Sequence, residues 1–413
     1  MLDIFFMTFF IVVLIDWSMI LNCLSFMFII TLFKICDSGM NLFKLIMILL
    51  SIWLLCMMFY SVHNNERSFL LALIFMLVLM SLEITFMSYK MIFFYIGFEM
   101  SVIPVLIIIL GWGYQPDRIE AGMYMLLYTV FFSLPLLLGI FYMNYMTNIF
   151  MITVLMFIMS FMVKLPMFGV HMWLPRAHVE APVYGSMILA GVMLKLGGYG
   201  IIKVSFFLGD FLYKYCKLLV VYSVVGGFLL SLICFMQSDM KMLVAYSSIV
   251  HMSLVLSGLL TLKSIGLSGA IFMMIGHGLC SSGLFCVLGF TYNRTHTRSI
   301  FFNKGLIFIM PLISLWWFLF CSSNLSFPPC LNLSGELFLF ISILHWEPSM
   351  FFILMMLGTI SSLYSIYLFS FTQHGKYLKS YSYMNLSMME SLGLMLHWFP
   401  LNILVFDLHL MMF

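Results

Sequence analysis

Apolar runs long enough to cross a lipid bilayer follow one another along almost the whole chain. A transmembrane helix needs about 20 apolar residues. Runs of this kind fall near residues 4–33, 41–60, 69–89, 91–110, 119–142, 150–168, 183–204, 218–236, 242–261, 266–290, 304–345, 350–371 and 392–411. The first run and the run at 304–345 are too long for one straight crossing, so we expect about 13 or 14 transmembrane helices.

The length of these runs also selects the type of secondary structure. In lipid the backbone must satisfy its own hydrogen bonds, which leaves only helical bundles and closed barrels. A barrel would show alternating runs of about ten residues, whereas these runs are continuously apolar. Charged residues make up only 8% of the chain, against roughly a quarter in soluble domains. We therefore predict an all-α polytopic membrane protein, with 1–413 as a single membrane domain made of N-terminal helices (1–89), a core (90–345) and C-terminal helices (346–413).

The distribution of basic residues and cysteines argues against two classes of function. Lys and Arg are scattered rather than clustered, which argues against a nucleic-acid-binding surface. The nine cysteines lie mostly inside apolar runs and form no CxxC pair, which argues against a metal cluster or a disulfide framework. Basic residues divide too evenly between the two faces to predict the orientation in the membrane.

Two segments break the helical pattern at membrane depth. The first is Lys164-Leu165-Pro166, which is followed by a polar loop, and the second is "CSSNLSFPPCLNLSGELF" at 321–338. Proline removes a backbone donor and interrupts a helix, and irregular backbone in a membrane is tolerated only where protein or water surrounds it. Paired interruptions in two halves of a chain point to inverted repeats. We therefore expect broken helices near Lys164–Pro166 and Ser322–Glu336.

Four charged residues lie where the chain otherwise excludes charge. Lys164 and Lys195 lie deep in apolar sequence, Glu99 is central in "MIFFYIGFEMSVIPVLIIIL", and Glu336 follows the second break. A charge at the bilayer centre costs about 2.5–3.5 kcal/mol on the insertion scale. Such residues are functional by default and need partners inside the bundle.

Two histidines complete the set of titratable residues inside the apolar runs. His251 and His277 are surrounded by small and hydroxyl residues, which allow close helix approach and room for water. Neutral imidazole can accept a proton on one nitrogen and release one from the other. Together with the two lysines and two glutamates, these histidines provide the titratable groups that a proton relay needs. Such a relay requires no metal or organic cofactor.

Each of these residues also has a structural interpretation. The lysines could form a buried ion pair or lie at the interface, Glu99 could bond a carbonyl released by Pro104, Glu336 could cap a half-helix, and the histidines could join helices. We interpret four loop residues as locking the loop: His171, Arg176, His178 and Glu180. Three further acids are expected to be edge or packing residues: Asp16, Glu83 and Asp407.

Several segments resemble the antiporter-like subunits of proton-pumping NADH:ubiquinone oxidoreductase, respiratory complex I, in their mitochondrially encoded form. The longest is "VKLPMFGVHMWLPRAHVEAPVYGSMILAGVMLKLGGYG" at 163–200, whose His-x-Trp-Leu-Pro-x-Ala-His-x-x-Ala-Pro pattern is specific to the chain 4 family over its sister chains. Four more segments carry the resemblance: "FFYIGFEMSVIPVLIIILGWGYQPDRIEAGMYMLLYT", "SDMKMLVAYSSIVHMSLVL", "MMIGHGLCSSGLF" and "PPCLNLSGELFLF".

The resemblance implies a fold and a set of roles. The fold is an antiporter-like bundle of two inverted five-helix repeats, each with one broken helix. The implied relay consists of Glu99 as the channel glutamate, Lys164 as its partner, Lys195 as the central lysine, His251 and His277 as connecting residues, and Glu336 as the terminal acid. The core at 90–345 would then translocate protons.

The resemblance also implies a setting for the chain. It would be a multi-pass protein of the mitochondrial inner membrane, between sister antiporter-like chains and in contact with other complex I subunits and membrane lipids. NADH, flavin, iron–sulfur clusters and ubiquinone would be bound by other subunits, and none by this chain. Two alternatives stay open: a subunit of a multi-chain sodium/proton antiporter, and a structural scaffold whose buried charges are only ion pairs.

Overall fold

The computed structural model describes residues 2–12, 14, 16–37, 42–63, 66–142, 151–376 and 384–411. Over these residues the chain is helical and contains no β-strand, apart from one isolated bridge between Asp239 and Ser299. The helices are α1 (Leu2–Val12), α2 (Trp17–Asp37), α3 (Leu42–Ser61), α4 (Phe69–Met87), α5 (Met91–Met100), α6 (Val102–Trp112), α7 (Arg118–Tyr142), α8 (Met151–Lys164), α9 (Trp173–Glu180), α10 (Val183–Ile188), the π-helix η2 (Leu189–Met193), α11 (Leu194–Cys234), α12 (Met240–Leu260), α13 (Ser264–Thr295), α14 (Leu306–Ile309), α15 (Pro311–Asn324), α16 (Leu331–Trp346), η3 (Pro348–Met350), α17 (Phe351–Gln373), α18 (Met388–Ile403) and η4 (Leu404–Met411).

The predicted all-α membrane bundle is confirmed. Eleven helical segments of the described chain are long and apolar enough to cross a membrane, and α1, α8 and α16 contain shorter apolar helices. The predicted 13 or 14 crossings are reached only when these shorter helices are counted. The division of the chain into two inverted five-helix repeats stays a prediction.

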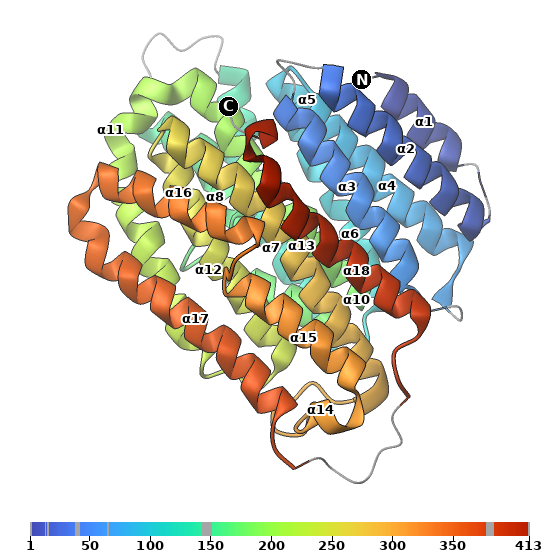
Figure 1. Ribbon diagram of the computed structural model, residues 1–413. Coiled ribbons are helices and arrows are strands. Elements are labelled where there is room, and N and C mark those ends of the chain that lie inside the picture. The colour runs from blue at the N-terminus through green and yellow to red at the C-terminus, as the bar shows by residue number, and fades with distance from the viewer. Residues whose placement is uncertain are drawn as a thin grey trace.

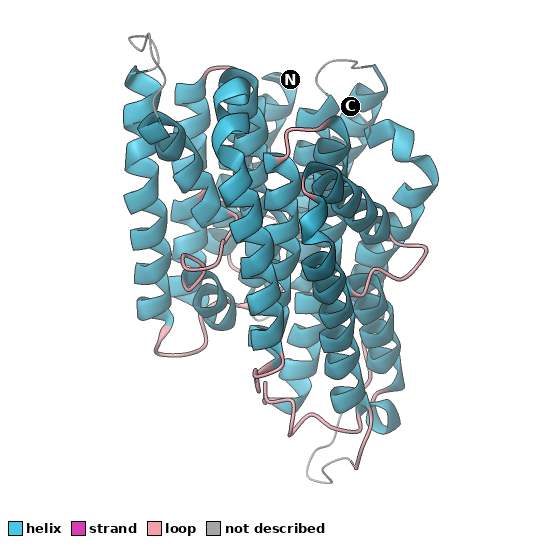
Figure 2. Ribbon diagram, turned by 90° about the vertical axis from the view of Figure 1, so that its left-hand side faces the viewer, coloured by secondary structure: helices cyan, strands magenta, loops and turns pink. Residues whose placement is uncertain are grey.

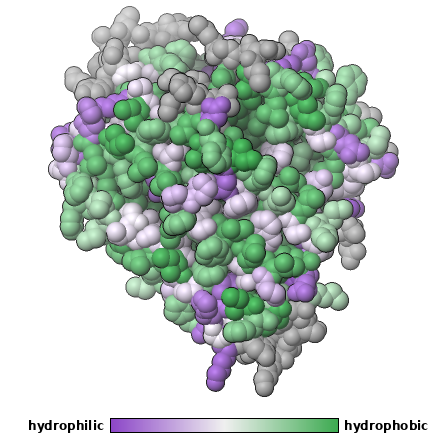
Figure 3. Space-filling model, in the orientation of Figure 1, coloured by the Kyte–Doolittle hydropathy of each residue, from purple (hydrophilic) through white to green (hydrophobic). Residues whose placement is uncertain are grey.

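The helices pack side by side into one bundle (Figures 1 and 2). We call the end where α3 begins and α4 ends the upper end, as in Figure 1. At the centre, the most apolar stretches of α12 and α13 are buried. Toward the outside, α2, α17 and α18 bury only a fifth to a third of theirs. Hydrophobic residues cover most of the face that Figure 3 shows, as a lipid-facing surface requires.

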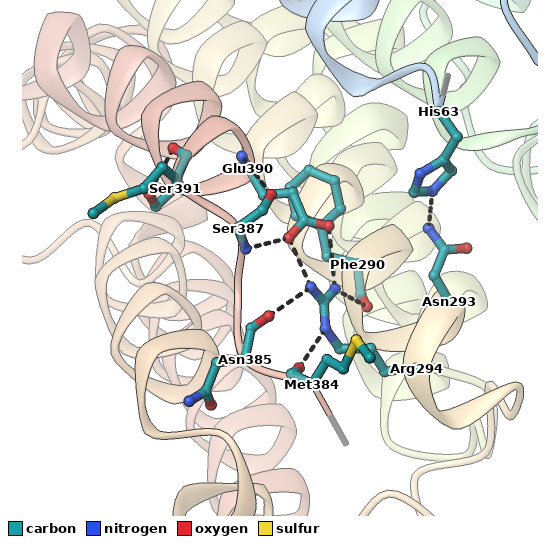
Figure 4. Close-up of polar contacts among 10 residues, drawn as sticks. His63, Phe290, Asn293, Arg294, Met384, Asn385, Ser387, Glu390 and Ser391 are labelled. Atoms are coloured by element: carbon teal, nitrogen blue, oxygen red, sulfur yellow. Dashed lines mark hydrogen bonds and ion pairs between the residues drawn. The ribbon is translucent and has the colours of Figure 1, made fainter. Parts of the chain in front are cut away.

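At the lower end, α18 is fixed to α13 by one arginine. The Arg294 guanidinium donates to both carboxylate oxygens of Glu390, at 3.3 and 2.7 Å, and to the carbonyls of Met384 and Asn385 (Figure 4). Glu390 also accepts from the backbone N–H of Ser387, whose hydroxyl caps α18 in return. A bidentate pair that also caps a helix fixes both position and direction, so α18 is held across the face of the bundle.

Both predicted interruptions are present. The helix α8 ends at Lys164, two residues before Pro166, and the chain becomes helical again at Trp173. The second interruption separates α15, which ends at Asn324, from α16, which begins at Leu331. Pro166 at the first interruption is buried, whereas Pro328 and Pro329 at the second are exposed. In both places proline removes backbone donors and the helix is broken. The first break follows Lys164 directly, and Glu336 lies in the half-helix that follows the second.

Candidate functional site

Glu99 and Lys164, which we call the first pair, both lie at the ends of helices. A turn at Ser101 separates α5 from α6, and Glu99 precedes it. The buried ammonium of Lys164 donates to the carbonyl oxygen of Phe98 at 2.9 Å and lies 3.4 Å from the centroid of its ring. Lys164 is therefore held by a backbone carbonyl and a ring face.

The carboxylate of Glu99 attracts the Lys164 ammonium without contacting it. The two groups interact electrostatically, but the ion pairs within 4.0 Å among the described residues do not include this pair. One carboxylate oxygen of Glu99 is buried and has no hydrogen-bond partner. The structure thus brings the two predicted residues near each other without an ion pair and leaves one carboxylate oxygen of Glu99 without a hydrogen-bond partner among the described residues.

Lys195 follows a local widening of its helix that the sequence did not predict. In the π-helix η2 the N–H of Leu194 donates to Leu189 O rather than to Ala190 O. A carbonyl that would accept in a regular α-helix therefore loses that donor. The Lys195 ammonium donates to this Ala190 oxygen and lies 3.1 Å from Nδ1 of His277 on α13.

From His277 the polar contacts continue toward α16 and α17. The ring centroids of His277 and His251 are 5.6 Å apart. Nδ1 of His251 is 3.3 Å from a carboxylate oxygen of Glu336, a distance that allows an ion pair although the angle does not qualify as a hydrogen bond. Nε2 of His251 is 3.4 Å from the hydroxyl of the buried Tyr364. We call Lys195, His277, His251, Glu336 and Tyr364 the central chain.

The central chain is buried at one end and reaches the surface at the other. The side chains of Lys195 and His277 are buried, whereas that of Glu336 is 14% exposed. Imidazole rings placed between an amine and a carboxyl group can accept and release protons in sequence. The geometry of these four predicted residues therefore suits proton transfer, although their roles stay predictions.

Lys164 and Lys195 are not in contact. The seam between α8 and α11 on this side is apolar: Phe161 and Leu165 pack against Gly197, and Phe161 also packs against Gly200. A side chain at either glycine would collide with these groups, which are within 3.0 Å of an added Cβ. The helices therefore approach closely, and a proton passing from one lysine to the other needs water or side-chain movement.

The sequence analysis did not identify Tyr364 of the central chain, and it gave a different role to His178. Tyr364 lay within an apolar run, and its only signal was the serines around it. His178 was interpreted as a loop residue, yet it is buried with both nitrogens unpartnered and its ring stacks on Phe285 at 4.7 Å. Burial, followed by repulsion from Lys241 and Lys195, lowers the pKa of His178 to about 3. It is therefore a neutral imidazole in the neighbourhood of Lys195 and Lys241.

The segment around His178, which the sequence analysis expected to be a loop, forms the helix α9 and contacts residues of other elements. Arg176 pairs with Glu120, Lys241 donates to the carbonyls of Val179 and Ala181, and Arg298 donates to that of Val179. The locking role of His171, Arg176, His178 and Glu180 stays a prediction.

The three acids expected at edges or in packing differ in burial. Asp16 and Asp407 are exposed, while Glu83 is completely buried. The hydroxyl of Thr8 lies 2.7 Å from Phe5 O and 2.9 Å from one carboxyl oxygen of Glu83, and it can donate its proton to either. The other oxygen of Glu83 has no partner among the described residues. Glu83 therefore packs between α1 and α4, where Thr8 is its polar neighbour.

Comparisons with known proteins agree with this arrangement. The family described as NADH:quinone oxidoreductase/Mrp antiporter, transmembrane region, matches residues 88–363. NADH-ubiquinone oxidoreductase chain 4 of Ceratitis capitata is 45% identical over 386 residues, covering 89% of this chain and 86% of the relative. That of Aedes aegypti is 45% identical over 325 residues, covering 75% and 73%.

Two solved structures share the fold. A chain of respiratory complex I from Thermus thermophilus with bound NADH has a TM-score of 0.88 at 17% identity, covering 98% of this chain and 94% of that chain. A chain of the Mrp complex from Dietzia sp. DQ12-45-1b has a TM-score of 0.76 at 17% identity, covering 84% and 69%.

Proposed function

This chain belongs to the NADH:quinone oxidoreductase/Mrp antiporter transmembrane family, and we propose that it is a proton-translocating subunit of the membrane arm of NADH:ubiquinone oxidoreductase. Its relatives named chain 4 match most of its length. It is accordingly part of a proton-translocating enzyme with several subunits. The mitochondrial inner membrane is its proposed location, between sister antiporter-like chains.

The proton path that we propose runs from the first pair to the central chain. Glu99 and Lys164 change their separation when a signal arrives along the membrane arm, because neither is locked to the other. The proton then passes through Lys195, His277 and His251 to Glu336. Each proton moved against 100 mV requires about 2.3 kcal/mol, which is close to the effect of a two-unit change in the pKa of one group. Electron transfer and its cofactors are assigned to other subunits.

The observation that carries this proposal is the 3.1 Å contact between the side chains of Lys195 and His277, both of which are completely buried inside the bundle. Lys195→Met tests it, because methionine keeps much of the length and removes the proton. In the assembled complex we expect NADH-driven proton translocation to fall on the order of 100-fold with assembly retained on native gels. The exposed Lys376→Met is the matched control. Failure of Lys195→Met to assemble would favour the scaffold function instead.

The likeness to the Mrp complex favours one second candidate, a subunit of a sodium/proton antiporter. The two functions separate in membrane vesicles. Proton uptake that follows a sodium gradient without NADH would favour the antiporter, whereas uptake that requires NADH and ubiquinone favours the pump.

A further inference from the structure

A crevice at the upper end of the bundle carries two lysines that the proton relay does not use. It lies between the start of α3, the α4–α5 connection, α11 and the start of α13. Its volume is about 360 Å³, within the range of roughly 300–1,000 Å³ for ligand pockets. Lys44 comes from α3 and Lys203 from α11, while aromatic and aliphatic side chains form most of the remaining wall.

Lys203 is fixed in position and keeps one N–H donor available. Its ammonium donates to the carbonyl and to the hydroxyl of Ser88, which caps α4, and it lies 4.9 Å from the ring centroid of Phe94. An ammonium has three donors, so one remains after these two bonds. The lysine is therefore pre-organised at the crevice, and no carboxylate of the described residues forms an ion pair with it.

Lys44 has no described acceptor. Its ammonium lies 4.0 Å from the ring centroid of Tyr89, and neither lysine has a carboxylate within 4.0 Å among the described residues. Two like charges in one crevice repel each other, and an anion between them would remove that repulsion. The four remaining N–H donors match the acceptor oxygens of a phosphate group.

The apolar part of the crevice faces outward at the level where helices end. Phe206 and Phe207 line it and are 81% and 53% exposed. Lys44 is the third residue of α3, and Ser88 is the C-cap of α4. In a membrane this is the headgroup level, where lysines extend toward anions and aromatic side chains contact acyl chains.

We propose that this crevice binds an anionic phospholipid. The lipid phosphate accepts from Lys44 and Lys203, and an acyl chain lies along Phe206 and Phe207. A free phosphate ion would use only the cationic part of the crevice, whereas a phospholipid matches both parts. The site is separate from the proton path, so the proposal does not rest on the assignment of any relay residue.

The test uses the intact complex in nanodiscs of phosphatidylcholine that contain a trace of photoactivatable phosphatidylglycerol. Mass spectrometry of cross-linked peptides is expected to place the label on the segments around Lys44 and around 199–207. Each lysine replaced by glutamine is expected to reduce the labelling about fivefold, so Lys44→Gln with Lys203→Gln should reduce it more than tenfold. Lys90→Gln is the matched control, because Lys90 is exposed next to Tyr89 and does not line the crevice.

Four outcomes would overturn the proposal: equal labelling by photoactivatable phosphatidylcholine, unchanged labelling in the double variant, displacement of the label by millimolar inorganic phosphate, or cross-linking of the crevice to another subunit in place of lipid. Lys203 bonds to Ser88, so the double variant could fail to assemble. Lys44→Gln alone then decides, because Lys44 donates to no described residue, and a reduction smaller than twofold would contradict the proposal.

Discussion

Lys164 and Lys195 are both buried ammonium groups, yet they are held in different ways. Lys164 in the first pair contacts a carbonyl and a ring, and its carboxylate partner stays beyond ion-pair distance. Lys195 in the central chain contacts a histidine that leads through a second histidine to a carboxylate. The first arrangement permits movement of the charges, and the second provides neighbours for proton transfer. We infer that the first pair acts as the switch and the central chain as the conductor.

His277→Phe interrupts the central chain and should have the largest effect. Phenylalanine fills the space but neither accepts nor donates a proton, so NADH-driven proton translocation should fall on the order of 100-fold while the complex assembles. The dye response of reconstituted vesicles measures this. The control is His397→Phe, because His397 is equally buried but bonds only to Gly393 O within the described chain. An equal loss of proton translocation in the two variants would show that His277 contributes only packing, as His397 does.

Glu99→Gln tests the first pair and should have a smaller effect. Lys164 keeps its bond to Phe98 O, so the complex should assemble, but the charge that moves the lysine is gone. We expect coupled turnover to fall about tenfold, which corresponds to about 1.4 kcal/mol. The exposed Asp407→Asn serves as control, because Asp407 takes part in none of the ion pairs among the described residues. A loss larger than that of His277→Phe would reverse the comparison between the two regions.

Acid should destabilise the protein through His178, which borders the central chain. Its pKa is about 3 in the fold against the ordinary 6.5, so the unfolded chain binds the proton first as the pH falls. The stability from this residue is complete above pH 6.5 and is lost progressively toward pH 3. His178→Phe should therefore reduce the drop in thermal midpoint between pH 7.5 and 5.5. The exposed His374→Gln should leave that drop unchanged.

Tyr364→Phe should have a modest effect on the central chain. When the phenol donates to Nε2 of His251, the proton of the ring is on Nδ1 and points toward Glu336. Loss of the hydroxyl leaves the packing intact but no longer selects the tautomer of His251. We therefore expect coupled turnover to fall two- to fivefold, which corresponds to about 0.5–1 kcal/mol. The pH dependence of turnover should also shift. A variant with an unchanged pH profile would show that the hydroxyl only packs.

Glu83→Gln should have the smallest effect, because this carboxyl lies outside both regions. The amide oxygen of glutamine can accept from Thr8 as the carboxyl oxygen does, so the free energy of unfolding should change by less than about 0.5 kcal/mol. Thermal unfolding of the complex and proton translocation in vesicles measure the two effects. If proton translocation falls as much as in Glu99→Gln, Glu83 acts together with Glu99 and Lys164.

The fold class and the identity of the buried charges followed from the sequence alone. The cost of placing a charge in lipid depends on one residue and its neighbours along the chain, so Lys164, Lys195, Glu99 and Glu336 were recognised without a structure. The two interruptions followed from proline, whose effect on a helix is also local. Helix number was less certain because α1, α8 and α16 are shorter than a full crossing.

Only the tertiary structure decided which of these residues meet. The contact between Lys195 and His277 joins residues 82 positions apart, and the π-helix that orients Lys195 leaves no mark in the hydrophobic pattern. Three further features depend on helices that are distant in sequence. These are the separation of Lys164 from Glu99, the burial of His178, and the position of Lys44 and Lys203 in one crevice. The cost of transferring a side chain into lipid depends on the residue itself, whereas a contact depends on how the helices pack. The sequence therefore determined which residues are buried charges, and the fold determined which of them are in contact.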